Sequence, residues 1–341
     1  MTVLGANERF EFARLRLTCP IALYARRLRQ DLLGGRILAE ASTRRSQPDT
    51  VVVVWVIALF VITGIGILPL FLYRLDLSKL TFSSSVPIVA GIGIELTAYA
   101  PTLAALLVAG FIVRKAGIRS LLRPVIRWRV GIHWYLIALA GPSILFVAGD
   151  LIRLLADAPL PTSWFAIPSA GAAAFLLGAL IAGSFGEEVG WRGLGQPRLQ
   201  QQYGAFWAAV IVGSVWSLWH LWPAVAPGGI ATMTWSDVGL TFLRLTSTSI
   251  IYAWLYNNTG GSLLVVMLAH AGHNIAVRIL PAAGSVTHGD HVVAGLYAVA
   301  AAAVVFVAGG RWLTRSHVFP DRPPTLPHVG MHVGSSPVPP L

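Results

Sequence analysis

Two adjacent acids and a nearby arginine interrupt an apolar part of the chain in the stretch GSFGEEVGWRGLG, residues 183–195. On a helix, Glu188 and Arg192 are four residues apart and share a face, so they can form an ion pair. Glu187 points about 100° away, towards the side of Trp191. One carboxylate is then neutralised by its neighbour while the other stays available to accept a proton, as a general base does. The alternative is that both acids only flank the end of a membrane helix and are solvated.

Histidines interrupt two further apolar stretches. The segment SVWSLWHLW places His220 one helical turn after Trp216, and LAHAGHNIA places His270 and Asn274 on one helix face. A single buried histidine more often serves packing than catalysis. Each polar group is costly inside an apolar segment, however, so the recurrence of an acid pair, a histidine and a His-x-x-x-Asn pattern favours a catalytic site.

The composition places these groups in a membrane protein. Mean hydropathy is +0.70. Hydrophobic residues make up 55% of the 341-residue chain and charged residues only 11%, against about 25% in an ordinary soluble domain. The predicted fold class is all-α, a polytopic membrane bundle of about eight transmembrane helices. The arginine-rich composition is typical of GC-rich genomes and favours the bacterial plasma membrane as its location.

Eight apolar runs are long enough to cross about 30 Å of hydrocarbon. They fall at residues 51–73, 86–113, 132–155, 167–186, 205–222, 238–256, 261–281 and 291–310. Twenty of the 25 Lys and Arg residues lie in the N-terminal arm, the loops at 114–130 and 187–204, and the C-terminal tail. By the positive-inside rule both termini are expected to be cytoplasmic. The basic residues thus fix topology and meet anionic lipid, and no nucleic-acid partner is predicted.

Three regions are expected along the chain. Residues 1–50 form a basic cytoplasmic arm, residues 51–312 the transmembrane bundle, and residues 313–341 a proline-rich disordered tail. A stripe of small side chains, which lets a second helix approach closely, is formed by Ala182, Gly186 and Gly190.

The polar groups can act together only if they lie at one depth in the membrane. His220 falls fifteen residues into its predicted span, about 22 Å along a helix, whereas Glu187 lies near the end of its own span. We therefore expect the nominal loop after Glu187 to be helical, as far as Gly193 or Pro197. We also expect Glu187 to lie within hydrogen-bond or single-water reach of His220.

Five further charges map to the outer halves of predicted spans. These are Glu95, Asp150, Arg153, Arg244 and Arg278. The favoured interpretation is a structural ion-pair network that locks the helices together. The alternative is a polar pathway for an ion or a solute, which would support a transporter.

The three polar stretches together resemble the CaaX protease and bacteriocin-processing (CPBP) family of intramembrane glutamate endopeptidases, which includes the Ras-converting CaaX prenyl protease. That family shows Glu-Glu-x-x-x-Arg, Phe-x-x-x-His and His-x-x-x-Asn in this order. The same patterns begin here at Glu187, Trp216 and His270, and only the second departs, with Trp in place of Phe. The similarity covers roughly residues 85–280, the predicted protease-like core.

The resemblance implies an intramembrane protease and a role for each motif residue. Glu187 would be the base that activates a water molecule, with His220 sharing that water. His270 and Asn274 would donate hydrogen bonds to the oxyanion of the tetrahedral intermediate. The residues expected to support them are Glu188, Arg192 and Trp216.

The resemblance also favours a site that uses no cofactor. One Glu and two His residues could ligate zinc, so zinc stays an alternative, although H-E-x-x-H is absent and Asn is a poor zinc ligand. The expected partners are the lipid bilayer and a peptide or lipidated protein substrate, prenylated or not. Two other functions stay open: a catalytically silent binding or immunity partner of the same family, and a transporter, which lacks here the internal repeat typical of that class.

Overall fold

The computed structural model describes residues 49–76, 86–156, 183–227, 233–280 and 290–314, with Gly178 alone in the gap before residue 183. The described part is helical and contains no β-strand. The predicted arm at 1–50 and tail at 313–341 lie almost wholly outside the described residues, as does most of the predicted span at 167–186.

The described helices follow one another along the chain in the order below. They are α2 (Thr50–Leu72), α3 (Ile88–Ala98), α4 (Ala100–Leu122), the 3₁₀ turn η2 (Arg123–Ile126), α5 (Ile132–Leu155), the π-helix η3 (Val189–Gly195), α7 (Gln196–Trp219), α8 (Trp222–Val225), α9 (Trp235–Asn258), α10 (Leu263–Ile279) and α11 (His291–Ala308). Residues 183–188 are helical and lead directly into η3. Within the described ranges, five helices are long and apolar enough to cross a membrane, or six if the bent pair α3 and α4 is one span. The all-helical, multi-pass prediction is therefore confirmed.

One predicted span is two helices in the structure. The apolar run at 86–113 divides into α3 and α4, which meet at an angle of 68°. The break lies at Tyr99, just before Pro101 in the first turn of α4. A proline has no N–H to donate, so it fits the first turn of a helix better than its interior. Because the residues on both sides of Pro101 are apolar, hydropathy alone did not indicate the bend.

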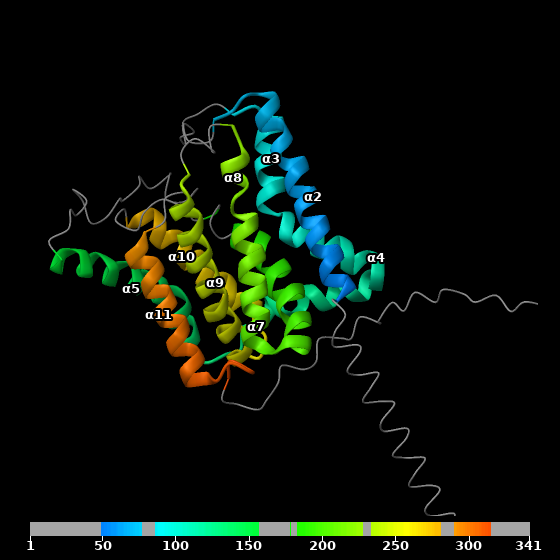
Figure 1. The fold of residues 1–341 in the computed structure, drawn as a ribbon. Coiled ribbons are helices and arrows are strands. Elements are labelled where there is room, and N and C mark those ends of the chain that lie inside the picture. Colours follow the sequence, from blue (N-terminus) through cyan, green and yellow to red (C-terminus); the bar gives the residue numbers. More distant parts are fainter. Residues whose placement is uncertain are drawn as a thin grey trace, which may run out of the picture. The chain divides into compact units, whose positions relative to one another are not determined.

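The helices pack in two neighbouring groups, one formed by α5, α7, α9, α10 and α11 and the other by α2, α3 and α4 (Figure 1). Helix α7 lies along α9, and α9 along α11; α5 packs against α10; α2 packs against α3 and α4. The π-helix η3 contacts α4 on one side and α7 on the other. This position makes η3 the link between the two groups.

Residues 183–219 form a helical hairpin. At Gly204 the backbone leaves the helical region, with φ of 78° and ψ of 169°, a conformation that favours glycine. The chain then folds back, so the hairpin has a first arm before Gly204 and a second arm after it. Trp216 in the second arm of the hairpin donates a hydrogen bond to Glu187 in the first. The segment after Glu187, predicted to be helical, is helical in the structure. The hairpin places Glu187 and Trp216 side by side, although they are 29 residues apart in the sequence.

Several described basic residues meet at the Gly204 end of the bundle. Arg198 pairs with Asp49 at the start of α2, at 2.8 Å. Ser262 donates to the backbone of Arg127, and the N–H of Ala205 donates to the backbone of Arg311. Asp49, Arg127, Arg198 and Arg311 therefore lie at one end of the bundle.

The outer-half charges form part of the expected ion-pair network. Asp150 pairs with Arg153 at 3.1 Å, and Arg153 also pairs with Asp290 at the start of α11, which joins α5 to α11. Arg244 makes no ion pair with any described residue. Glu95 is exposed on α3, and the side chain of Arg278 lies outside the described set.

Two small residues let η3 and the helix before it approach the bend between α3 and α4. A Cβ on Gly190 would lie 2.4 Å from the carbonyl oxygen of Pro101, and a Cβ on Gly186 would lie 2.9 Å from the ring of Tyr99. The same Pro101 oxygen accepts a hydrogen bond from the indole of Trp55, at 3.0 Å. The predicted close approach is therefore found at these two glycines, while Ala182 lies outside the described residues.

We expect Gly190→Ala to destabilise the protein by about 2–3 kcal/mol, because the added methyl group meets backbone that cannot rotate away. Thermal unfolding in detergent measures this effect. Gly64→Ala is the matched control, since a Cβ there meets nothing within 4 Å. Equal unfolding temperatures for the two variants would contradict the packing described here.

Candidate active site

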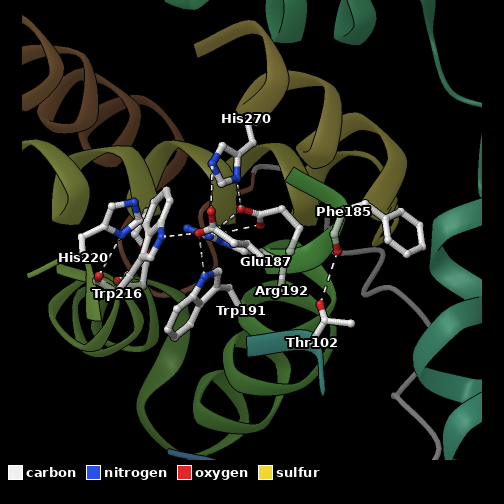
Figure 2. A network of polar contacts seen from close by, with 11 residues as sticks. Thr102, Phe185, Glu187, Trp191, Arg192, Trp216, His220 and His270 are labelled. Atoms are coloured by element: carbon white, nitrogen blue, oxygen red, sulfur yellow. Dashed lines mark hydrogen bonds and ion pairs between the residues drawn. The ribbon is translucent and has the colours of Figure 1, made fainter. Parts of the chain in front are cut away.

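Glu187 lies at the centre of the polar groups, held by two tryptophans. Its Oε2 accepts hydrogen bonds from the indole N–H of Trp216 at 2.7 Å and from that of Trp191 at 3.3 Å. Figure 2 shows the carboxylate enclosed by these two indoles and by the ring of His270. Since both indoles bind Oε2, the second oxygen, Oε1, remains available for another partner.

Trp191 owes its position to the fully buried Trp55 of α2. The two indole rings meet edge to face with centroids 5.2 Å apart. Trp191 also contacts the ring of Trp219, at 6.1 Å. Aromatic rings in this geometry restrict one another, so helices α2 and α7 fix the indole that holds Glu187.

Glu188 is fully buried, and its carboxylate contacts both a guanidinium and an imidazole. The Nη1 of Arg192 lies 3.1 Å from each of its carboxylate oxygens, and the Nδ1 of His270 lies 2.8 Å from Oε1. The predicted pairing of Glu188 with Arg192 is therefore confirmed. The contact between Glu188 and His270 was not predicted, because helix periodicity indicates a face but not the partner across it.

The guanidinium of Arg192 is enclosed by aromatic rings. It lies 4.8 Å from the ring centroid of Trp216 and 5.0 Å from that of Tyr252, at distances typical of cation–π contacts. Its position follows from η3, in which the N–H of Gln196 donates to Trp191, five residues earlier. π-Helical turns are often found at functional sites.

His270 bridges the two glutamates. While Nδ1 contacts Glu188, Nε2 lies 3.8 Å from Oε1 of Glu187, too far for a direct hydrogen bond. A water molecule about 2.8 Å from each atom can contact both across this gap. The ring thus has one nitrogen fixed and the other directed at the free oxygen of Glu187, as the histidine of a hydrolytic triad is oriented by its acid.

His220 lies on the far side of Trp216 from Glu187 (Figure 2). Its Nδ1 donates to the backbone oxygen of Trp216 at 3.1 Å, and its ring contacts the ring of Trp216 edge to face at 5.5 Å. No hydrogen bond joins it directly to Glu187 among the described residues. The expected contact of His220 with Trp216 is found, while the water shared between His220 and Glu187 stays a prediction.

Asn274 follows His270 by one turn of α10 and is half buried. The described part of the chain offers its amide no hydrogen-bond partner. The neighbouring His273 turns away, with Nδ1 2.7 Å from the hydroxyl of Tyr297 on α11. Of the two histidines on this helix, only His270 therefore contacts the glutamates.

Two residues of the site were missed by the sequence analysis. Trp191 was named only as the neighbour of Glu187, yet its indole binds that carboxylate. Tyr252 lies beside His270, with the two rings 6.0 Å apart, and its buried hydroxyl has no hydrogen-bond partner among the described residues. The signal for Trp191 was available, because it follows Glu187 by four residues, but nothing in the sequence pointed to Tyr252.

The described residues hold no group of three or more His, Cys, Asp or Glu side chains arranged to bind a metal ion. Both nitrogens of His270 face carboxylates, and His220 is bonded to the backbone.

Comparison with known proteins places this site in a recognised region. Residues 168–276 match the family described as Type II CAAX prenyl endopeptidase Rce1-like, and this segment contains all three motifs. The chain is also 29% identical over 140 residues to CAAX prenyl protease 2 of Methanococcus maripaludis. That match covers 39% of this chain and 48% of the relative, so the chain spans about half the length of the curated relative it matches.

Proposed function

Because residues 168–276 match the Rce1-like CAAX prenyl endopeptidase family, we propose that the chain is an intramembrane endopeptidase that cleaves a membrane-associated or lipidated peptide or protein. One observation carries the proposal. Glu187 has one carboxylate oxygen fixed by two indoles, and its other oxygen lies 3.8 Å from Nε2 of His270. A carboxylate and an imidazole in this arrangement can hold and activate a water molecule.

The first chemical step is removal of a proton from this water by Glu187. The hydroxide so formed adds to the carbonyl carbon of the peptide bond, and the carbonyl oxygen takes the negative charge. Glu187 then passes its proton to the leaving nitrogen as the C–N bond breaks, which gives a carboxylic acid and an amine. General acid–base catalysis of this kind contributes about 10²–10⁴-fold to the rate.

His270 is proposed to donate to the developing oxyanion through Nε2. Two carboxylates and one guanidinium leave a net negative charge in this buried site, and a proton on His270 balances it. The ring then donates from Nδ1 to Glu188 and from Nε2 to the oxyanion, with the amide of Asn274 as the second donor. His220, which supports the Trp216 indole, is proposed to share the attacking water from its free Nε2.

The proposed substrate is a lipidated peptide, by analogy with the prenyl protease relatives. We also propose that both termini face the cytoplasm of a bacterial cell, with eight spans in the plasma membrane. The basic segments gathered at the Gly204 end support this orientation through the positive-inside rule.

The proposal is tested with purified protein in liposomes and a panel of fluorescent peptides. The panel contains S-prenylated peptides ending in Cys-Val-Leu-Leu, N-acylated peptides, and peptides tethered by a transmembrane segment. Mass spectrometry identifies the products, with and without a chelator. We expect cleavage of at least one lipidated peptide at a rate that the chelator leaves unchanged.

Two results would contradict the proposal in different ways. Cleavage that stops when the chelator is added would assign the chemistry to a metal ion. Tight binding of a panel peptide without any cleavage would favour the silent binding or immunity partner.

A further inference from the structure

Arg244 of α9 is a buried cation that no described residue neutralises. Arg244 is only 5% exposed, and neither its Nε nor its Nη1 has a hydrogen-bond partner among the described residues. These two nitrogens carry three of the five N–H bonds of a guanidinium. A buried charge is normally paired, so this arginine is suited to bind an anion that the described part of the chain does not provide.

A second polar side chain on the same helix has no partner either. Thr241 precedes Arg244 by three residues, which places both on one face of α9. It is 4% exposed, and its buried hydroxyl makes no hydrogen bond with any residue that the structure describes. The Thr241 hydroxyl and the Arg244 guanidinium therefore form a pair of neighbouring hydrogen-bond donors on the buried face of α9.

The surroundings of Arg244 connect it to the candidate active site. Arg244 precedes Tyr252 by eight residues on α9, about 12 Å along the helix, and the ring of Tyr252 lies 6.0 Å from that of His270. The guanidinium and the proposed oxyanion donor are therefore separated by about two turns of α9. An extended peptide of a few residues that starts at His270 and runs along α9 spans this distance.

We propose that Arg244, with Thr241, binds a carboxylate of the peptide substrate. The inference rests on the proposed peptidase function, which supplies a peptide as the ligand. A guanidinium fits a carboxylate better than an ammonium group does, because its planar N–H donors match the carboxylate oxygens. The C-terminal carboxylate of the peptide is the source we assign, so that cleavage occurs within a few residues of the chain end.

Binding measured without turnover tests this assignment. The protein carries Glu187→Gln, and the probe is a fluorescein-labelled S-prenylated peptide ending in Cys-Val-Leu-Leu, as the free acid and as the C-terminal amide. We expect the acid to bind at least about tenfold more tightly than the amide, as for one charged hydrogen bond. Adding Arg244→Gln should abolish that preference and leave amide binding within about twofold.

Two further variants and one further peptide test whether the effect is specific to Arg244 and to the C-terminal carboxylate. Arg129→Gln, at an exposed arginine of the 123–131 segment, is the matched control and should keep the preference for the acid. Arg244→Lys should keep part of it, which separates loss of charge from loss of folding. An amide peptide with Asp as its last residue tests an acidic side chain as the source.

Equal binding of acid and amide, or a preference that survives Arg244→Gln, would overturn the assignment. A loss of binding for both peptides that depends on anionic lipid would assign Arg244 to a lipid phosphate instead, and would also overturn it. Because the readout is binding, these failures are distinct from a failure of the parent protein to cleave peptides, which would concern the proposed function.

Discussion

Glu187→Gln is expected to lower peptide cleavage by about 10³-fold or more while the protein stays folded. Glutamine has the shape of glutamate, and its amide oxygen can still accept the hydrogen bonds of Trp191 and Trp216. An amide has no basic oxygen to take a proton from water, so the loss reflects the missing general base. Initial rates on the best lipidated peptide, beside thermal unfolding of each protein, measure the two effects separately.

Glu95→Gln provides the matched control for this variant. Glu95 is an exposed glutamate of α3, outside the proposed site, so the same chemical change there should leave the rate within about twofold. Glu187→Gln that retains a tenth or more of the parent rate would show that another group activates the water.

Arg192→Met is expected to destabilise the protein by about 3–5 kcal/mol, the range for removing one partner of a buried ion pair. The side chain of Arg192 is fully buried, as is that of Glu188. Without the guanidinium, the carboxylate of Glu188 keeps only His270 as a partner, and the contacts with Trp216 and Tyr252 disappear. Chemical or thermal unfolding in detergent measures the change.

The double variant Arg192→Met with Glu188→Gln distinguishes charge from packing. Removing both charges leaves no uncompensated ion in the interior, so the double variant should be more stable than Arg192→Met alone. If the two substitutions instead add their separate costs, the ion pair is not the interaction that Arg192 contributes.

Sequence reasoning succeeded where length and periodicity decide the structure. The runs at 132–155, 238–256 and 291–310 correspond closely to α5, α9 and α11, because a long apolar segment in a membrane protein has few alternatives to a helix. The pairing of Glu188 with Arg192 followed from their spacing on one helix. The helical character of the segment after Glu187 followed from the requirement that polar groups meet at one depth.

The rest depends on contacts between helices, which periodicity does not specify. The spacing of His220 and His270 does not indicate which of them contacts the glutamates. In the structure, His270 contacts both Glu187 and Glu188. Trp216 was interpreted only as an aromatic residue that replaces the Phe of the family pattern. Its indole N–H, which donates a hydrogen bond to Glu187, was not considered. The bend before Pro101 was hidden by apolar residues on both sides.

The hairpin that turns at Gly204 affects how the protein enters the membrane during synthesis. Its first arm carries Glu187, Glu188 and Arg192, and a charge at the centre of a lone helix costs about 2.5–3.5 kcal/mol to insert. The hydrogen bond from Trp216 comes with the second arm, but the contacts of His270 come with α10, some fifty residues later in the sequence. The partners of the first arm are therefore complete only after α10 has been made, so the candidate site is assembled late in synthesis.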